Sequence, residues 1–337
     1  HNIDIKNCRG QSYDNASNMA GKYNGVQAKI KEVCRYAQFV PCFGHSLNLI
    51  GNEAANCSSK AAAFFDFLQS LYNFFASSTH RWAGLKNFIG EAPTLKSLSV
   101  TRWSARADAA KALVKGYHEI SEALLAIDQD INERRENRHV ADVLRRKMQQ
   151  LEIGILAHFW FTLLARFNET SMSLQSVELD LNNAVNLMKS LCEYVASLRE
   201  QFQFFELEGK KLSGCSDYKS ASERNRGRSV RLTRFEGSAE EVIQTPRDKF
   251  RTDVFLPIID NILQSFQKRL AAYSSLSESF GFFHRMLDLN SDDLRKAAAK
   301  LVCDYPDDLE QSAPEEFVQY VEFARLSLAR SPDVKDS

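Results

Sequence analysis

A series of helical hydrophobic stripes, beginning near residue 58, constrains the fold of this chain more than any other feature. Apolar side chains there recur three and four residues apart, the spacing that places them on one face of an α-helix. Long amphipathic helices that pack side by side as a bundle are therefore predicted, with aromatic-rich faces that form core rather than a cofactor site. The stripes comprise Phe64, Phe67, Leu68, Leu71, Tyr72 and Phe75; Leu113, Tyr117, Ile120, Leu124, Ile127 and Ile131; Val140, Leu144, Met148, Leu151, Ile155 and Phe159; Leu174, Val177, Leu181, Val185, Met188, Cys192, Val195 and Phe202; and Phe255, Ile258, Ile259, Ile262, Leu263, Phe266 and Leu270.

The first 57 residues have a mixed character. Residues 22–34 predict a helix, and the apolar pair Phe39-Val40 before Pro41 predicts a short buried strand. Apolar residues from Leu47 to Ala54 predict a second helix. This alternation indicates a piece of an α/β unit, which the helical region then follows.

Composition excludes several classes of protein. The 337 residues are 44% hydrophobic and 26% charged, as in a globular protein with a real core. The formal net charge is zero, so any DNA binding must come from local patches. Seven scattered cysteines indicate reduced thiols rather than a disulfide framework, and no apolar run is long enough to span a membrane. Because the chain begins at His1 within a motif, we expect a piece of a longer protein.

Asp14 is the candidate acid, within a loop rich in glycine and small polar residues. A carboxylate in such a loop can reach Mg²⁺, which prefers oxygen ligands. The alternative is that Asp14 caps the helix that follows it, because aspartate is a favoured cap residue.

Cys42 and His45 form a Cys-x-x-His pair with side chains suited to zinc. A structural zinc site needs four ligands, and the other candidates, Cys34 and Cys57, lack paired spacing. The alternative is a buried thiol beside a hydrogen-bonded histidine.

Arg102 and Trp103 stand between two predicted helices. An arginine can grip phosphate with its fork, and a tryptophan can stack on an unpaired base. The alternative is a tryptophan in the bundle core beside a solvated arginine.

Residues 209–249 predict a long mobile loop, because glycine, serine and arginine replace the helical pattern. Residues 209–236 hold eight basic against three acidic residues. This charge could neutralise DNA phosphates, act as a nuclear import signal, or simply form a solvated loop. The central basic residues are Arg224, Arg226, Arg228 and Arg231.

Two helix starts carry local signals. Ser291 precedes two aspartates as a predicted N-cap, and Ser312 begins a predicted capping box with Pro314 in the first turn. The sequence holds no P-loop, no G-x-G-x-x-G, no G-x-S-x-G and no H-E-x-x-H motif, so we expect no small-molecule substrate.

Three motifs in order resemble the hAT superfamily of transposases, and more narrowly the transposase-derived region of zinc finger MYM-type protein 1-like proteins. The motifs are Gly10-Gln11-Ser12-Tyr13-Asp14-Asn15-Ala16-Ser17-Asn18-Met19-Ala20-Gly21, then Cys42-Phe43-Gly44-His45-Ser46-Leu47-Asn48-Leu49, then Thr101-Arg102-Trp103-Ser104. The likeness extends through Ser173-Leu174-Gln175 to the helix at Phe255-Leu256-Pro257.

The resemblance implies an α+β, mostly α fold. A partial RNase H-like catalytic domain would occupy residues 1–57, and an all-helical insertion domain would occupy residues 58–337. In that family three acids hold two metal ions and cut DNA. Asp14 matches the second acid, Gln11 belongs to its motif, Cys42 and His45 match the turn beside the active site, and Trp103 matches the residue that stabilises a flipped base.

The family's first aspartate and final glutamate have no counterpart in this chain. One acid cannot hold two metal ions, so the resemblance implies a nuclear, DNA-associated segment that does not cut DNA alone. Mg²⁺ or Mn²⁺ would bind only in a catalytically active parent. Two alternatives stay open: a domesticated helical module that binds proteins or itself without touching DNA, and a part of an active transposase.

Overall fold

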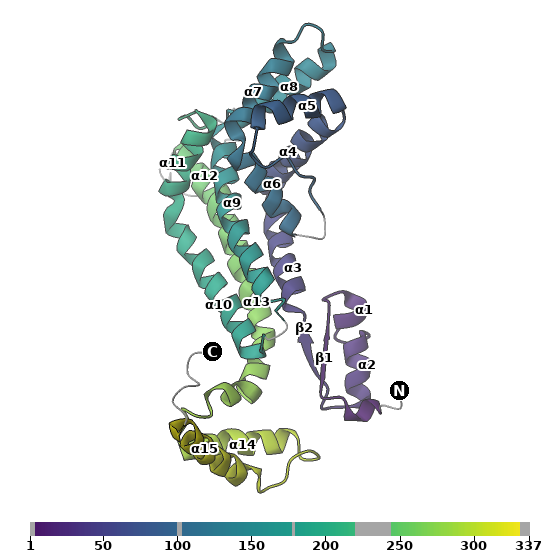
Figure 1. The fold of residues 1–337 in the computed structure, drawn as a ribbon, viewed down its shortest axis with the longest axis vertical. Helices are drawn as coiled ribbons and strands as arrows, with labels where there is room; N and C mark the ends of the chain where they lie inside the picture. The colour runs from purple at the N-terminus through teal and green to yellow at the C-terminus, as the bar shows by residue number, and fades with distance from the viewer. Residues whose placement is uncertain (1–3, 100–102, 177–178, 220–243, 331–337) are drawn as a thin grey trace, which may run out of the picture. The chain divides into compact units, whose positions relative to one another are not determined.

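The protein is almost wholly helical in the computed structural model, which describes residues 4–99, 103–176, 179–219 and 244–330 (Figure 1). Within those ranges there is one sheet, of two parallel strands. The chain divides into two compact units. Unit 1 comprises residues 1–49, 170–190 and 265–337, and unit 2 comprises residues 50–169 and 191–264.

The sheet of unit 1 pairs β1 (Gly10–Tyr13) with β2 (Gln38–Pro41). Gly10 lies opposite Gln38, and Tyr13 lies opposite Pro41. Parallel strands need a crossover connection, and here it contains α1 (Ser17–Ala20) and α2 (Val26–Val33). Figure 1 shows α2 beside the two strands.

The strand at β2 was predicted from its apolar pair, whereas β1 was interpreted as part of a loop. Gly10, Gln11 and Ser12 have little intrinsic preference for strand, so β1 owes its conformation to the pairing with β2. The predicted helix over residues 22–34 is confirmed over Val26–Val33, as α2.

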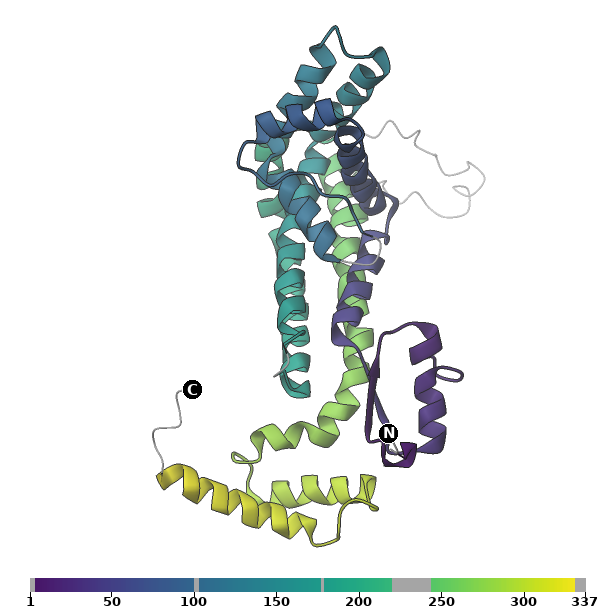
Figure 2. The same ribbon diagram turned by 45° about the vertical axis from the view of Figure 1, so that its right-hand side comes forward.

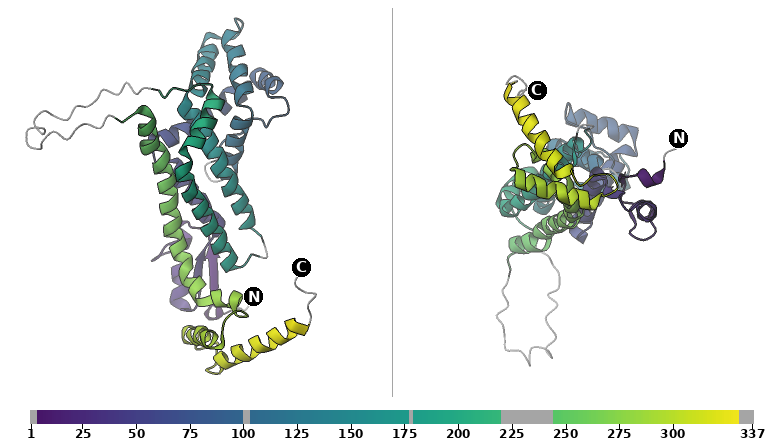
Figure 3. Two further views of the ribbon diagram at one scale, coloured as in Figure 1. Left: turned by 90° about the vertical axis from the view of Figure 1, so that its left-hand side faces the viewer. Right: turned by 90° about the horizontal axis from the view of Figure 1, so that it is seen from below.

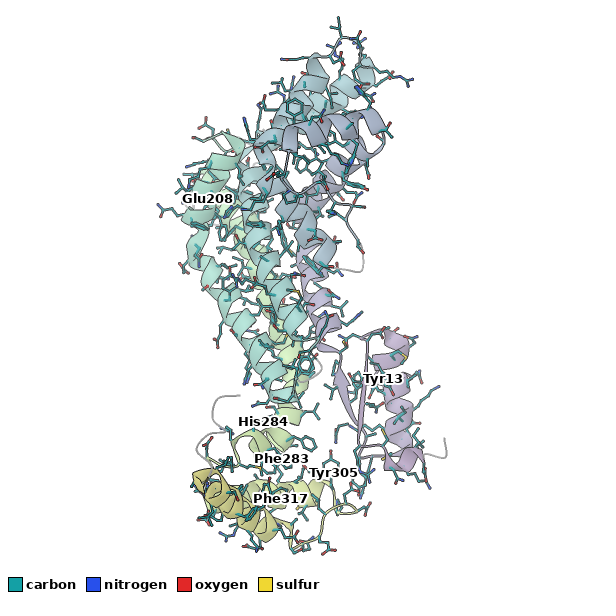
Figure 4. The ribbon with its side chains drawn as sticks, in the orientation of Figure 1. Tyr13, Glu208, Phe283, His284, Tyr305 and Phe317 are labelled. Atoms are coloured by element: carbon teal, nitrogen blue, oxygen red, sulfur yellow. The ribbon has the colours of Figure 1, made fainter. Side chains whose placement is uncertain are left out.

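The rest of unit 1 is helical. Its core contains Cys34, Tyr36, Ala37, Phe282, Leu294, Leu301, Tyr305 and Val321. The labelled rings of Phe283 and Phe317 in Figure 4 lie 5.7 Å apart, and α14 and α15 pack against each other in Figure 3. The elements are η1 (Ile5–Asn7), the first part of α3 (Phe43–Ala55), the end of α9 (Leu151–Ser173), the first part of α10 (Leu181–Ser197), the last part of α13 (Leu256–Phe280), η4 (Gly281–Arg285), α14 (Ser291–Asp304) and α15 (Ala313–Arg330).

Unit 2 is a packing of helices around an aromatic core. Trp160 and Phe159 of its longest helix are fully buried, and Phe159 contacts Phe205 and Phe255 edge-on. Its elements are the end of α3, α4 (Ser59–Ala76), α5 (Thr79–Ile89), α6 (Trp103–Lys115), α7 (Tyr117–Gln129), α8 (Arg135–Met148), most of α9, the end of α10, η2 (Leu198–Gln201), α11 (Phe202–Ser213), α12 (Pro246–Phe250), the π-helical turn η3 (Arg251–Phe255) and the start of α13.

Two glycines set the distance between α9 and α11. A Cβ atom on Gly154 would overlap the backbone of Gly209, and one on Gly209 would overlap Ile155. The two helices therefore approach more closely than any larger residue at these positions would allow.

Two predicted stripes are each divided between two helices. The stripe from Leu113 to Ile131 breaks at Gly116, and that from Val140 to Phe159 breaks after Met148. α7 and α8, which the turn at residues 130–134 joins, pack side by side (Figure 2), and the Tyr117 hydroxyl donates to the Met148 carbonyl at 2.7 Å. Ile131 lies beyond α7 and is 84% exposed, so the prediction that it faces the core was wrong.

Other helix boundaries differ from the predicted ones by a few residues. Asn290, rather than Ser291, caps α14, since its side chain accepts from the Asp293 amide. Ser312 does precede α15, but its hydroxyl bonds to the Glu316 carboxylate. The predicted loop over 209–249 is shorter at both ends, because α11 continues to Ser213 and α12 begins at Pro246.

The predominantly helical class is confirmed, and the strand content is limited to the two strands of unit 1 among the residues that the structure describes. The two units are defined by which residues pack together, and each combines segments that are far apart in the sequence. The boundary at residue 57 and the RNase H-like character of residues 1–57 stay predictions.

Candidate functional site

Asp14 and Cys42 follow the carboxyl ends of β1 and β2, respectively. Because the strands are parallel and Tyr13 pairs with Pro41, both residues leave the sheet at the same edge. The Cys42 amide donates to the Tyr13 carbonyl at 2.9 Å, which extends the pairing by one step. Carboxyl edges of parallel sheets are where such sheets bind ligands.

The Asp14 side chain is exposed, and its Oδ1 accepts a hydrogen bond of 3.2 Å from the Ala16 amide. The following helix, α1, begins at Ser17 after the cap residue Ala16. Asp14 thus stabilises the turn before that helix, which is close to the capping alternative, while its carboxylate remains accessible to solvent. Across the described ranges, no group of three or more His, Cys, Asp or Glu side chains is arranged to hold a metal ion.

Three buried polar groups fix the loops at this edge. The Asn15 amide donates to Ser46 Oγ at 2.9 Å, Ser46 Oγ lies 2.8 Å from Tyr273 Oη, and Tyr273 Oη donates to the Pro41 carbonyl at 3.1 Å. Since Tyr273 uses its proton on Pro41, Ser46 must donate to Tyr273. A continuous chain of hydrogen bonds thus runs from Asn15 through Ser46 and Tyr273 to the Pro41 carbonyl.

The aromatic part of Tyr273 completes this packing. Its ring stacks on Phe43 with 4.0 Å between the centroids, and the residue is fully buried. Burial raises the pKa of the Tyr273 hydroxyl to about 12, so the group stays neutral and continues to donate. The result is a rigid support beneath the Asp14 edge.

The motif residues Gln11, Cys42 and His45 have different environments. Gln11 is 7% exposed, and its Nε2 donates to the carbonyls of Gln27 and Ala37 at 3.1 and 3.2 Å. It therefore connects β1 to α2 and to the start of β2. Cys42 is exposed, and His45 is half-buried in the first turn of α3.

The additional cysteines considered for zinc are engaged elsewhere. The Cys34 thiol is buried and lies 3.1 Å from the carbonyls of both Lys6 and Cys8. Burial raises the pKa of the Cys57 thiol, which disfavours the thiolate that zinc requires. Neither cysteine joins Cys42 and His45 in a metal-ligating group among the described residues.

Trp103 begins α6 and lies in the core of unit 2. It is 6% exposed, and its ring centroid is 6.3 Å from that of Phe65 and 6.2 Å from that of Trp160. This is the core position that the sequence left open as an alternative. A stacking role in DNA binding stays a prediction, and it would require the indole to leave this packing. Arg102 lies outside the described residues.

The predicted basic segment, residues 209–236, is described only over residues 209–219. Arg224, Arg226, Arg228 and Arg231 lie outside the described residues. At the near end, Lys210 lies 3.6 Å from Glu206 and Lys211 lies 2.5 Å from Glu208, the residue labelled in Figure 4. Carboxylates thus balance the first two lysines of the segment.

Glu206 bonds to Tyr218, which lies within the basic segment, and to Arg247, which lies beyond it. Its carboxylate accepts from the Tyr218 hydroxyl at 2.9 Å and from Arg247 Nε at 3.0 Å, and the residue is 6% exposed. Burial raises the pKa of Glu206, but the hydrogen bonds from Tyr218 and Arg247 outweigh it and hold the pKa below its ordinary value. One carboxylate of unit 2 therefore holds both Tyr218 and Arg247.

Two features of these sites were not predicted. The pairing of Ser46 with Tyr273 joins residues 227 positions apart, and no local signal in the sequence indicates it. Arg106 lies one helical turn after Trp103 and has a half-buried guanidinium, although the sequence analysis did not select it. Its position three residues after a buried tryptophan was the only available indication.

No protein-family model matches the chain, and no solved structure matches it significantly. Among the helices that the structure describes, none combines the length and the apolar character needed to cross a bilayer.

Proposed function

We propose that this chain is a DNA-associated segment of a hAT-like, transposase-derived nuclear protein. The observation that carries the proposal is the position of Asp14 and Cys42 directly after two paired parallel strands. An RNase H-like unit uses such a carboxyl edge to present acids to metal ions and DNA. The three motifs occur in the order expected of the superfamily, which supports the same origin.

DNA contact is assigned to the basic segment, with Arg102 and Trp103 as further contacts. The formal net charge of the chain is zero, so a local cluster must supply the attraction. Glu206 holds Tyr218, before the four central arginines, and Arg247, after them, at one carboxylate of unit 2. Asp14 would hold Mg²⁺ or Mn²⁺ only in a parent that supplies the remaining acids.

Salt-dependent binding to a labelled DNA duplex tests the proposal. The logarithm of the binding constant should fall linearly with the logarithm of salt concentration, with a slope of about −0.9 for each phosphate neutralised. Replacing Arg224, Arg226, Arg228 and Arg231 together by Gln should weaken binding and flatten that slope.

The matched control removes four exposed lysines elsewhere, with Lys60, Lys111, Lys147 and Lys296 changed to Gln. It alters the net charge equally and should leave the slope nearly unchanged. An equal effect of the two variants, or no binding by the wild type at low salt, would contradict the proposal.

A second candidate function is a helical protein-interaction module without DNA binding. The observation favouring it is an apolar face on α15, where Tyr320, Phe323 and Leu326 are 57%, 66% and 60% exposed. Sedimentation equilibrium compares the wild type with Phe323→Asp. Self-association that the substitution abolishes, in a chain that binds no DNA, would favour this candidate.

A further inference from the structure

A pocket of about 390 Å³ lies in unit 2, between the end of α3, α4, α6 and the segment of residues 97–99 that comes before α6. Its lining includes Asp66 and Gln69 of α4, Ser97 and Leu98 of the segment, and Arg106 of α6. The volume falls at the lower end of the range of small-ligand pockets. Its polar residues come from four parts of the chain, including Asn56 after α3, and converge on one space.

Arg106 is an unpaired cation in this pocket. Its Nε and Nη1 atoms are buried without a hydrogen-bond partner. None of the ion pairs found among the described residues involves it, although Asp66 lines the same pocket. Burial lowers the pKa of this guanidinium, because a desolvated charge without a counter-ion is unfavourable. A buried polar group without a partner requires an explanation, and a bound ion is one of them.

Two aromatic rings hold the guanidinium in place. Its Cζ atom lies 4.8 Å from the centroid of Phe65 and 5.0 Å from that of Trp103. Cation–π contacts of this kind orient the group and offset part of the cost of burial. They do not provide the acceptor atoms that its N–H groups need.

The opposite wall of the pocket is also fixed. Gln69 Oε1 accepts from the Leu98 amide at 2.8 Å, and Gln69 Nε2 donates to Ser97 Oγ at 3.5 Å. These bonds attach the segment before α6 to α4. Binding an ion there would therefore need little reorganisation of the wall.

We propose that the Arg106 pocket binds a phosphate group. A guanidinium matches the oxygens of a phosphate through parallel N–H···O bonds, and a phosphate would supply both the acceptors and the counter-charge that Arg106 lacks. The exposed carboxylate of Asp66 at the rim opposes an anion and should limit its affinity. The source of the phosphate is a nucleic-acid backbone, a free nucleotide or inorganic phosphate, and the site does not depend on the proposed DNA association.

The first experiment titrates the full chain with inorganic phosphate, with unfolding temperature and the Arg106 Nε–Hε NMR signal as readouts. Phosphate should stabilise the wild type and shift that signal. Arg106→Gln should bind at least about ten-fold more weakly, since a charge-assisted pair is lost. The control is Lys111→Gln on the exposed side of the same helix, which removes the same charge and should bind as the wild type does.

Two further variants keep the test decisive. Should Arg106→Gln fail to fold, Arg106→Lys retains the charge without the fork and should weaken binding several-fold. Asp66→Asn removes the opposing charge and should tighten binding. Equal phosphate binding by wild type, Arg106→Gln and Arg106→Lys would overturn the inference, as would an unmoved Arg106 signal at saturating phosphate.

Separate titrations with a single-stranded oligonucleotide and with deoxyadenosine monophosphate distinguish the sources. Arg106-dependent binding of the oligonucleotide alone assigns the site to a nucleic-acid backbone, and binding of the monophosphate assigns it to free nucleotides. If duplex DNA fails to bind while inorganic phosphate still requires Arg106, the proposed function fails and this inference stands.

Discussion

The buried hydroxyl groups of Ser46 and Tyr273 lie 2.8 Å apart, although 227 residues separate them in the chain. Ser46 follows the Cys-x-x-His turn, and Tyr273 belongs to α13, which comes after the predicted basic loop in the chain. Their contact fixes the edge at which Asp14 and Cys42 leave the sheet. The local geometry of the candidate site therefore depends on a helix from the distant part of the sequence.

Tyr273→Phe should destabilise the protein while preserving the ring stack on Phe43. The substitution leaves the Ser46 hydroxyl without its acceptor and the Pro41 carbonyl without its donor, which costs about 1–3 kcal/mol of unfolding free energy. Urea denaturation measures the change. Tyr320→Phe, at a tyrosine that is 57% exposed, is the matched control and should have little effect.

Gly51→Ala should destabilise unit 2, because a Cβ atom there would overlap the buried indole of Trp103. Overpacking of this kind costs about 1–3 kcal/mol. Gly84→Ala is the control, since a Cβ atom at Gly84 meets no other atom within 4 Å and alanine favours the helix. Equal thermal stability of the two variants would mean that Trp103 does not occupy this core position.

Glu206→Gln should remove part of the acid sensitivity of unfolding. The pKa of Glu206 is held below its ordinary value in the folded state, because the hydrogen bonds from Tyr218 and Arg247 outweigh burial. Its carboxylate therefore stabilises the fold above the unfolded pKa of about 4.3, and this contribution is lost as the pH falls through the lower folded pKa.

Measuring the unfolding free energy as a function of pH tests the direction of this pKa shift. The difference between wild type and Glu206→Gln should be largest at neutral pH and shrink in acid. Glu91→Gln, at an exposed carboxylate in the same unit, should parallel the wild type. A difference that grows as the pH falls would show that Glu206 is protonated in the fold.

Asp14→Asn should leave stability within about 0.5 kcal/mol of the wild type, because the side chain is exposed and makes one hydrogen bond to the Ala16 amide. If Asp14 ligates a divalent cation, Mn²⁺ should broaden the amide NMR signals of residues 14–16 and 42–45 in the wild type and not in the variant. Identical broadening in both proteins would assign the metal to other residues.

Much of the local structure could be predicted from the sequence. The stripes located most of the helices, and Phe39-Val40 located β2, because burial of one face imposes a periodic pattern on the residues that form it. The helix boundaries and β1 were predicted less well. Gly116 and the Gln149-Gln150 turn interrupt stripes that are continuous in the sequence, so only tertiary packing distinguishes one helix from two. The residues of β1 have a weak intrinsic preference for the strand conformation, so only pairing distinguishes a strand from a loop there.

The candidate site, too, could be predicted only in part from the sequence. The sequence determined that the chain is predominantly helical, and it selected Asp14, Cys42 and Trp103 as residues to consider. Only the tertiary structure placed Asp14 and Cys42 at one sheet edge, buried Trp103 against Phe65 and Trp160, and left Arg106 without a partner in a pocket. The periodicity of a helix shows in residues three and four positions apart, so the sequence reveals it directly. Burial and pairing depend on contacts between residues far apart in the chain, and no local pattern in the sequence indicates those contacts.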